Sequence, residues 1–378
     1  MSVNKDLQNQ KPKLAFMINL IAPYRVPILA RLAECFELFI LHGQMESNRA
    51  WDQGVVAGAH ERPVWGWQYA YKVRKSGQLF DQRFFHFEPG YLIELLRIRP
   101  DAVITIELGF RTILAIIYGF LFRVPVWVSW EGSLHTEGGL DRPRRLFRRL
   151  IAGTIKHWIS WGQTSTEYLI SLNVSRGRIL QIQNCVDESW YVKPVAPAIS
   201  VFPKPVILHV GQIIARKGVA ELVRAAAALQ SEGANFSLVF VGDGPDLVGL
   251  KALAAQLDVK NLHFYPVQAA EAMPAFYRSA DVLVFPTMHD VWGLVANEAV
   301  LSGLIVLCSK HAGCAKELFS AECIFEPASP EEFLTAFRKA VAGKLPSSDS
   351  GKIKTIREVA EMIIAEVKAA LLNAKQAE

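Results

Sequence analysis

The sequence predicts an α/β fold with two doubly wound, Rossmann-like domains that face a central cleft. Its 378 residues exceed what one core usually supports, at roughly 150 residues per domain. Short apolar runs alternate with longer helical patterns, and this alternation occurs twice along the chain. A segment with four prolines, residues 192–205, separates the two series and should form a stiff, extended linker. We therefore predict one domain over residues 1–191 and a second over residues 206–353.

Most predicted strands are near-continuous apolar runs, which is typical of strands buried on both faces of a parallel sheet. Helical segments lie between many of them, for example over residues 218–230, as a doubly wound sheet requires. A last helix is predicted within residues 354–378 and is a candidate for packing back on the first domain. The predicted strands are Leu14–Asn19, Leu38–Leu41, Ala102–Ile106, Val126–Trp130, Trp158–Trp161, Ile179–Ile182, Val206–Val210, Leu238–Val241, Leu262–Phe264, Val282–Phe285, Ile305–Leu307 and Cys323–Phe325.

The composition excludes several classes of protein. A hydrophobic share of 51% and a charged share of 20% exclude general disorder and a collagen-like repeat. No apolar run reaches the roughly 18 residues of a membrane span, and we expect Thr112–Phe122 to form a buried helix. The five cysteines contain no C-x-x-C pair, which indicates reduced thiols. The first ten residues are polar and lack a secretory signal, so we expect a cytoplasmic protein.

Basic residues are concentrated in the first half. Residues 1–195 carry 24 Lys and Arg against 17 Asp and Glu, whereas the remainder carries 17 against 19. The first half therefore suits an anionic partner. No recognisable nucleic-acid recognition motif is present, so nucleic acid is not an expected partner.

The densest basic segment is RPRRLFRRL, residues 142–150, where arginines stand beside Leu146, Phe147 and Leu150. One interpretation is a helix that docks on anionic lipid headgroups, which would place the protein peripherally on the inner face of the membrane. The other is a solvated basic helix face, or a helix that faces a phosphate inside the cleft. The arginines are Arg142, Arg144, Arg145, Arg148 and Arg149.

A phosphate-binding turn is predicted at GQIIARKG, residues 211–218. This segment follows a predicted strand and opens a helix, whose first N–H groups and dipole favour an anion. Gly211 allows a tight turn, while Arg216 and Lys217 add positive charge. A diphosphate is the ligand that fits this pattern, and a solvated basic turn is the alternative.

The next predicted strand ends in VGDGP, residues 241–245. Gly242 and Gly244 permit close backbone approach, and Asp243 can cap the turn. The segment is not a G-x-G-x-x-G fingerprint, and it lacks the G-K-[ST] of a P-loop. The absence of these two motifs in this segment argues against a dinucleotide-dependent dehydrogenase and against a P-loop ATPase.

Two carboxylates eight residues apart lie in HDVWGLVANEAVLSG, residues 289–303. Asp290 falls in a loop after a predicted strand, Gly293 allows a sharp turn, and Glu298 lies in the helix that follows. Both carboxylates can face the cleft at this spacing and accept hydrogen bonds from the hydroxyls of a polyol. The alternatives are a helix cap for Asp290 and a solvent-facing position for Glu298.

An aromatic segment, WGWQYAY at residues 65–71, places Trp65, Trp67, Tyr69 and Tyr71 on one face of an extended chain. One interpretation is an edge strand with a packed aromatic face. The other is a surface on which sugars stack, and the sequence does not separate the two.

Taken together, the order and spacing of these motifs resemble the family 4 (group 1) glycosyltransferases of the GT-B fold. The resemblance covers nearly all of the second half and, more weakly, the first, and it includes residues 184–191 and 261–287. It implies retaining transfer of a hexose-type sugar from a nucleoside-diphosphate sugar to a hydroxyl of a glycan or lipid-linked glycan in surface polysaccharide or glycolipid biosynthesis. No D-x-D follows a predicted strand, so we expect neither a metal nor another cofactor. A GT-B sugar-nucleotide epimerase, a phosphorylase and a catalytically silent nucleotide-sugar-binding module remain as alternatives.

The resemblance also assigns the donor-binding residues. Lys217 matches the family's diphosphate-binding lysine, whereas Gln212 stands in place of an arginine, for which Arg216 is the substitute. Asp290 and Glu298 replace the family's pair of glutamates and would bind the transferred sugar and the ribose, respectively. Further implied contacts come from the backbone of Val291, Trp292, Gly293 and Leu294 to the sugar and phosphate, and from the backbone near Val267 to the base.

The first half departs from the family pattern. The family's Gly-Gly loop is replaced by INLIAPYRVP, so Tyr24 and Arg25 are expected to line the acceptor side. Glu131 stands where the family often has a histidine, and His135 is the second candidate for that role. Glu131 could accept the proton of the acceptor hydroxyl or shield the developing positive charge on the sugar. The predicted catalytic set is therefore Glu131 with Lys217 and Asp290.

Overall fold

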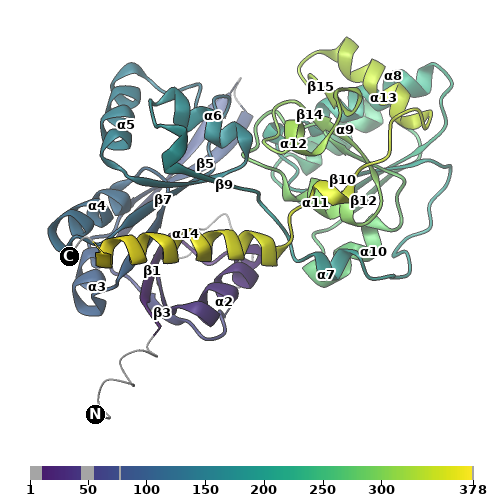
Figure 1. Ribbon diagram of the computed structural model, residues 1–378. Coiled ribbons are helices and arrows are strands. Elements are labelled where there is room, and N and C mark those ends of the chain that lie inside the picture. Colours follow the sequence, from purple (N-terminus) through teal and green to yellow (C-terminus); the bar gives the residue numbers. More distant parts are fainter. Residues whose placement is uncertain (1–10, 44–54, 76–77, 377–378) are drawn as a thin grey trace.

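The structure of the protein, a computed structural model, describes residues 11–43, 55–75 and 78–376. Two lobes stand side by side, each built around one parallel sheet (Figure 1). The predicted α/β class with two Rossmann-like sheets is confirmed. Within the described residues, no helix is long and apolar enough to cross a membrane.

The first sheet has seven parallel strands in the order β3-β2-β1-β6-β7-β8-β9. The strand order reverses at β1, which pairs with β2 on one side and β6 on the other. Ligands of such sheets bind at the carboxyl ends of strands beside this reversal. The strands are β1 Lys13–Ile18, β2 Glu37–His42, β3 His60–Pro63, β6 Ala102–Ile106, β7 Val126–Trp130, β8 His157–Trp161 and β9 Ile179–Ile182.

Helices cover both faces of the first sheet. Leu14 and Phe16 of β1 pack on one face with α2 and α14, whereas Ala15 and Met17 pack on the other with α3 and α4. This alternation is what a strand buried on both faces produces. The helices are α2 Val26–Cys35, α3 Gly90–Ile98, α4 Phe110–Phe122, α5 Arg142–Thr154, α6 Gln163–Ser171 and α14 Ile356–Gln376.

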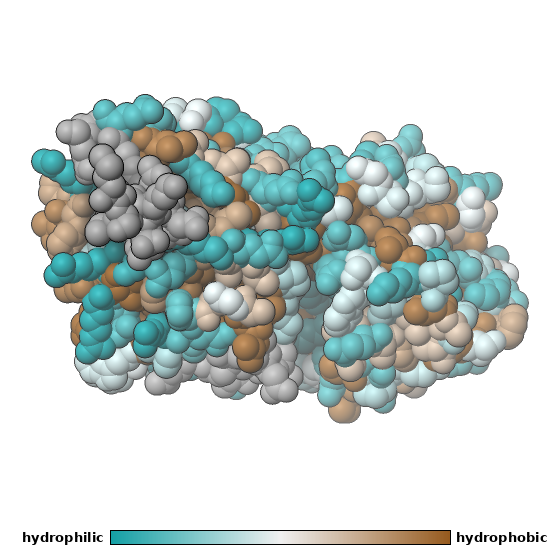
Figure 2. Space-filling view, turned by 60° about the horizontal axis from the view of Figure 1, so that its bottom comes forward, coloured by the Kyte–Doolittle hydropathy of each residue, from teal (hydrophilic) through white to brown (hydrophobic). Residues whose placement is uncertain are grey.

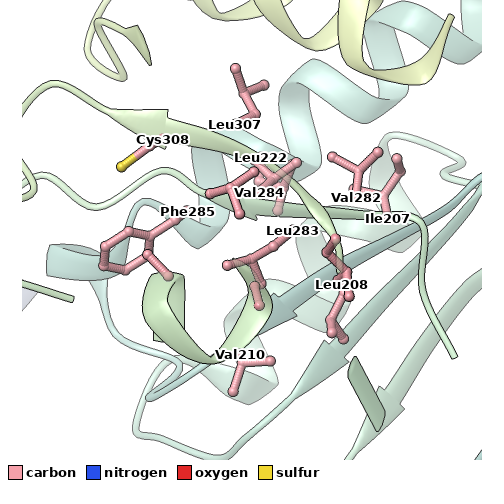
Figure 3. Close-up of a cluster of buried hydrophobic side chains, with 14 of the residues drawn as sticks. Ile207, Leu208, Val210, Leu222, Val282, Leu283, Val284, Phe285, Leu307 and Cys308 are labelled. Atoms are coloured by element: carbon pink, nitrogen blue, oxygen red, sulfur yellow. The ribbon is translucent and has the colours of Figure 1, made fainter. Parts of the chain in front are cut away.

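The second sheet has six parallel strands in the order β12-β11-β10-β13-β14-β15. Its order reverses at β10, so the loops after β10 and β13 meet at the carboxyl edge. Aliphatic side chains of β10, β13, β14 and α8 form the centre of its core (Figure 3). The strands are β10 Val206–Val210, β11 Ser237–Val241, β12 Leu262–Tyr265, β13 Val282–Phe285, β14 Ile305–Ser309 and β15 Ile324–Phe325, and the helices are α8 Val219–Ser231, α9 Leu247–Gln256, α10 Met273–Tyr277, α11 Leu294–Leu301, α12 Ala315–Leu318 and α13 Pro330–Val341.

The chain crosses twice between the lobes. It leaves the first sheet after β9, forms the short helix α7 (Glu188–Tyr191) and passes through residues 192–205 to β10. After α13 it returns, and α14 packs along α2 on the first sheet (Figure 1). The surface is hollowed between the two lobes (Figure 2).

Two sequence expectations about apolar segments are wrong. Residues 67–71 do lie in a strand, but its aromatic face is not packed. They belong to a separate antiparallel pair, β4 (Trp67–Lys75) and β5 (Gln78–Phe87), and Trp65, Trp67, Tyr69 and Tyr71 are exposed. The helix at Thr112–Phe122 is buried on one side only, with Phe120 84% exposed, because a helix that lies on a sheet buries only the side that faces it.

Candidate functional site

The predicted phosphate turn and the Asp290 loop form one unit at the carboxyl edge of the second sheet. Residues 211–218 run from β10 into α8 through the short 3-10 helix η3 (Ala215–Lys217). The Arg216 guanidinium donates a hydrogen bond to the His289 carbonyl oxygen at 2.9 Å, and the Met288 N–H donates to the Arg216 carbonyl oxygen at 2.8 Å. These bonds join the loops after β10 and β13, which are neighbouring strands.

An ion pair joins the two predicted catalytic residues of this domain. The Lys217 ammonium lies 2.5 Å from an Asp290 carboxylate oxygen, and both side chains are largely buried. Burial raises the pKa of Asp290, but the charges of Lys217 and Arg216 outweigh burial and hold that pKa below its ordinary value. Asp290 is therefore a carboxylate that can accept hydrogen bonds, beside two cations that can meet an anion.

Gly242 and Gly244 of VGDGP allow two backbone segments to pack closely. Gly242 has a φ of 148°, and a Cβ atom there would collide with the Gly211 carbonyl oxygen. A Cβ atom on Gly244 would likewise collide with the Ile213 carbonyl oxygen. The close backbone approach that the sequence indicated is thus made by the 211–218 loop itself, which these glycines allow to pack against the end of β11.

Glu298 is neither solvent-facing nor free. It lies on α11, which begins after Gly293, and its carboxylate accepts a hydrogen bond from the Tyr277 hydroxyl at 2.5 Å. Burial raises the pKa of Glu298, while hydrogen bonds from Tyr277 and Tyr191 act in the opposite direction. A ribose hydroxyl would share this carboxylate with Tyr277, a partner that the sequence reading did not identify.

One of the backbone N–H groups that were predicted to bind the sugar and phosphate already donates a hydrogen bond within the protein. The Trp292 N–H donates to the Asp290 side chain at 3.3 Å, so Asp290 also caps its own turn. The Trp292 indole is buried and donates to Asn297, whose amide donates to the Asn184 carbonyl oxygen at 3.0 Å. Asn297 therefore ties the loop to residues 184–191. Val291 and Leu294 are half-buried beside it.

Two predicted donor contacts lie at the margin of this edge. Gln212, in place of the family arginine, is exposed at the start of its loop. Val267 is exposed beyond the carboxyl end of β12, which is the edge strand three positions from β13. The structure therefore concentrates the charged groups at Lys217 and Asp290 and leaves Gln212 and Val267 on the surface.

On the first domain, Arg25 and Glu131 neutralise each other. They form an ion pair in which the arginine is buried, and its guanidinium lies 4.5 Å from the centre of the Trp161 ring. Tyr24 is half-buried, 5.6 Å from the same guanidinium. Neither member of the pair is a free lining group as the sequence suggested.

His135 contacts the loop after β13, which contains Met288 and Asp290. Its Nε2 donates to the Met288 carbonyl oxygen at 2.9 Å, and its ring stacks on His311 with centroids 3.9 Å apart. Burial, together with His135, lowers the pKa of His311, while Glu326 at 3.0 Å acts the other way. Of the two histidine-position candidates, His135 is the one that touches the Asp290 loop. No local pattern in the sequence indicated His311, because its partners His135 and Glu326 are distant along the chain.

Four of the five arginines on α5 face outward. Arg142, Arg144, Arg145 and Arg149 are exposed, whereas Arg148 is half-buried. Arg148 donates to Glu137 at 2.6 Å and to the Tyr168 hydroxyl at 2.8 Å, and it lies over the Trp130 ring. The expectation that Arg148 belongs to the basic surface is wrong, because these partners bind it inside the first domain.

The part of the chain that the structure describes contains no group of three or more His, Cys, Asp or Glu side chains that could hold a metal ion.

Comparisons with known proteins give a family. Residues 197–354 match the family model described as glycosyl transferases group 1. Lipopolysaccharide glucosyltransferase WaaG of Escherichia coli is 34% identical over 141 residues, which is 36% of this chain and 37% of that protein. The 2-deoxystreptamine glucosyltransferase of Streptomyces kanamyceticus is 35% identical over 100 residues, 26% of each chain. The matches thus span little more than a third of these relatives at most.

Solved structures match along the whole chain. Anabaena HepE in complex with UDP and glucose superposes with a TM-score of 0.63 at 14% identity and covers 97% of this chain and 100% of that one. Sucrose-phosphate synthase from Thermosynechococcus elongatus gives a TM-score of 0.65 at 15% identity, covering 97% and 98%. At this identity the likeness concerns the fold. The second domain thus matches the model of the group 1 glycosyl transferases, and the two-lobed fold of the whole chain is the GT-B fold of these solved structures.

Proposed function

We propose that the protein transfers a hexose-type sugar from a nucleoside-diphosphate sugar to a hydroxyl of a glycan or lipid-linked glycan acceptor. The observation that carries the proposal is the ion pair of Lys217 and Asp290 at the strand-order reversal of the second sheet, with Arg216 beside it. This arrangement supplies cations for a diphosphate and a carboxylate for sugar hydroxyls within one loop pair.

Leaving-group stabilisation is the task of the cations. As the bond between the sugar and the diphosphate breaks, negative charge grows on the departing phosphate oxygens. Lys217, Arg216 and the first N–H groups of α8 are fixed in place before the reaction, so they stabilise that charge without reorganising. We propose that these groups make the transfer independent of a metal, with retention at the sugar carbon.

The acceptor side is assigned to the first domain. The Arg25 guanidinium occupies the Glu131 carboxylate, and this contact disfavours Glu131 as the base that accepts the proton of the acceptor hydroxyl. His135, in contact with the Asp290 loop, is the alternative proton acceptor. Closure of the lobes about residues 192–205 would exclude water from the donor.

Glucose is the first donor sugar to test. The names of WaaG and of the Streptomyces relative describe glucosyltransferases, and the HepE structure holds UDP and glucose. The name of WaaG also supports a role in surface polysaccharide or glycolipid biosynthesis. We therefore propose UDP-glucose as the leading candidate among the nucleoside-diphosphate sugars.

The experiment is a thermal-shift panel of UDP-, GDP-, dTDP- and ADP-sugars, with and without magnesium. A ligand at 100 times its dissociation constant adds about 2.7 kcal/mol of stability, which shifts the midpoint measurably. A shift with one nucleotide that needs no magnesium would support the proposal. Flat curves for all of them would remove the donor site. Binding without transfer to any acceptor would favour the silent binding module, and interconversion of donors would favour an epimerase.

Peripheral contact with the inner face of the membrane is a second proposal. α4 and α5 lie on the same face of the first sheet. α4 exposes Phe120 and Leu121, and α5 exposes Leu146 and Leu150 among its four outward arginines. Apolar side chains among arginines suit anionic lipid headgroups. Flotation with anionic vesicles at low salt tests this. Leu146→Glu with Leu150→Glu should abolish flotation, whereas Val248→Glu on the second domain should not, and a wild-type protein that stays at the bottom would contradict the proposal.

A further inference from the structure

The hairpin of β4 and β5 carries a row of exposed aromatic side chains on one face. Trp67 pairs with Phe87 and Tyr69 with Phe85, and directly opposed residues of antiparallel strands point to the same side. Tyr71 follows at the next position on that side. These five side chains are between 41% and 69% exposed, which is unusual for large aromatic residues gathered in one place.

The row continues to the carboxyl edge of the first sheet. The Trp67 and Phe87 rings are stacked with centroids 5.9 Å apart, and Trp65 meets Trp67 edge to face at 4.6 Å. Phe87 in turn lies 4.4 Å from Phe110, the first residue of α4. Phe110 comes directly after the loop that follows β6, so the aromatic row begins where a ligand of the first sheet is expected.

The same hairpin lies beside the donor loop. β5 packs against η3, the segment Ala215–Lys217 that carries both cations of the donor site. β5 of the first domain therefore reaches the second domain at the segment that carries Lys217. A chain-like ligand on this hairpin would therefore lie close to the segment that carries Lys217.

We propose that this row binds the saccharide chain of the acceptor, with successive sugar rings stacked on successive aromatic side chains. The inference rests on the proposed function and adds that the acceptor carries several sugar units near its reacting end. Sugar rings present apolar C–H faces with a rim of hydroxyls. Exposed indole and phenol rings match this, because each offers a flat apolar face and a polar group at its edge. Side chains on one face of a strand recur roughly every 6.6 Å, so the row can contact more than one ring.

The position of the row favours a saccharide over a lipid surface or a second copy of the chain. The arginines and apolar side chains that suit lipid headgroups lie on α4 and α5. The aromatic row is instead joined to Phe110 and to the donor loop, so an occupant of the row is delivered to the proposed reaction.

Titration of the full chain with defined oligosaccharides tests the proposal. The probes are the α-1,4-linked series from maltose to maltohexaose, the β-1,4-linked series from cellobiose to cellohexaose, and chitobiose to chitohexaose, followed by calorimetry. We expect binding of at least one series to strengthen with length, and to weaken roughly tenfold in Trp67→Ala and in Tyr69→Ala. Phe120→Ala, a change of an even more exposed aromatic residue on α4, should leave it unchanged.

Several results would overturn the proposal. These are no saturable binding by any of the three series, affinity that does not depend on length, or an equal loss in Phe120→Ala. Loss of vesicle flotation or dissociation of a dimer in Trp67→Ala, with saccharide binding unchanged, would also overturn it in favour of a lipid surface or a second copy.

The nucleotide-sugar thermal shift, repeated on Trp67→Ala, separates this inference from the proposed function. The variant should keep the wild-type shift, because Trp67 is outside the donor loops. Flat donor curves in the wild type would remove the proposed function, while the oligosaccharide titration would still decide the role of the hairpin.

Discussion

Lys217 is the residue whose side chain distinguishes a diphosphate site from a solvated turn. Its ammonium is buried against Asp290, and a cation is retained in such a place only where its charge is compensated. A leaving diphosphate would compete with Asp290 for that cation. Under the proposed function, the pair would therefore link binding of the donor to release of the Asp290 carboxylate toward the sugar.

Replacing this lysine tests the assignment. Lys217→Ala should lower turnover by roughly 100-fold, the usual effect of removing one fixed charge-stabilising donor. Lys260→Ala, on an exposed lysine of the same domain, is the matched control and should leave turnover unchanged. Initial rates with UDP-glucose measure both. A Lys217→Ala enzyme within about threefold of wild type would mean that the phosphate assignment is wrong.

Asp290 should also govern part of the stability in acid. Its pKa in the folded protein lies below the ordinary 3.8, so its contribution is fully present above that value and is lost as the pH falls through the lowered folded pKa. Thermal midpoints measured from about pH 6 to about pH 3 should therefore fall at the acid end. Asp290→Asn should be less stable at neutral pH but lose less on acidification, and parallel curves for the two proteins would contradict this.

At the scale of elements, the loop after β11 depends on Gly242. Its φ of 148° and the Gly211 carbonyl oxygen leave no room for a Cβ atom. Gly242→Ala should cost about 2–4 kcal/mol of unfolding free energy and weaken donor binding, because the 211–218 loop must move. Gly249→Ala on α9, where a Cβ atom meets nothing, should instead stabilise by about 0.5–1 kcal/mol. Urea unfolding measures both changes.

The arginines of helix α5 have two different roles, although they form one continuous basic segment in the sequence. Arg148 binds partners inside the first domain, whereas Arg142 is exposed. Arg148→Ala leaves Glu137 and Tyr168 without their donor inside the first domain and should cost about 1–3 kcal/mol. Arg142→Ala, on an exposed arginine of the same helix, should change the unfolding free energy by less than about 0.5 kcal/mol. If vesicle flotation depends on the outward arginines, it should weaken in Arg142→Ala and persist in Arg148→Ala.

The burial of each strand explains whether it could be predicted from the sequence. Strands buried on both faces are apolar throughout, so Val206–Val210 and Val282–Phe285 were located to the residue. The strand His60–Pro63 has a polar sequence and pairs only with β2 at the sheet edge, so it gave no such signal. The period-two pattern of aromatic residues predicted which side chains share a face. It did not predict that this face is exposed to solvent. Arg148 and His311 turn inward because of partners distant in sequence, which no local pattern records.

At the scale of the whole molecule, the order of the motifs identified the family, whereas the contacts between the lobes were beyond the sequence. His135 meets Met288 and His311, and Asn297 meets Asn184, across the junction of the two lobes. Gln163 likewise donates its N–H to Glu317. Each contact needs both sheets in place before it can form. These contacts between the lobes are accordingly the part of the structure that the sequence predicted least specifically.

The core of the first domain also depends on a segment that is distant in sequence, because the last helix of the chain, α14, packs into it. Ile363 of α14 is 2% exposed and belongs to the cluster that contains Leu14 and Ile104 of the first sheet. Ile363→Ala should therefore lower the stability of the first domain by about 2–5 kcal/mol, although residue 363 follows the second domain in sequence. Glu361→Ala, an exposed position on the same helix, is the control. Hydrogen exchange resolves the two lobes: amides of β1 and β6 should lose protection in Ile363→Ala while those of β10 and β13 keep it. Equal loss in both sheets would mean that the lobes unfold as one cooperative unit, coupled through α14 and the contacts between them.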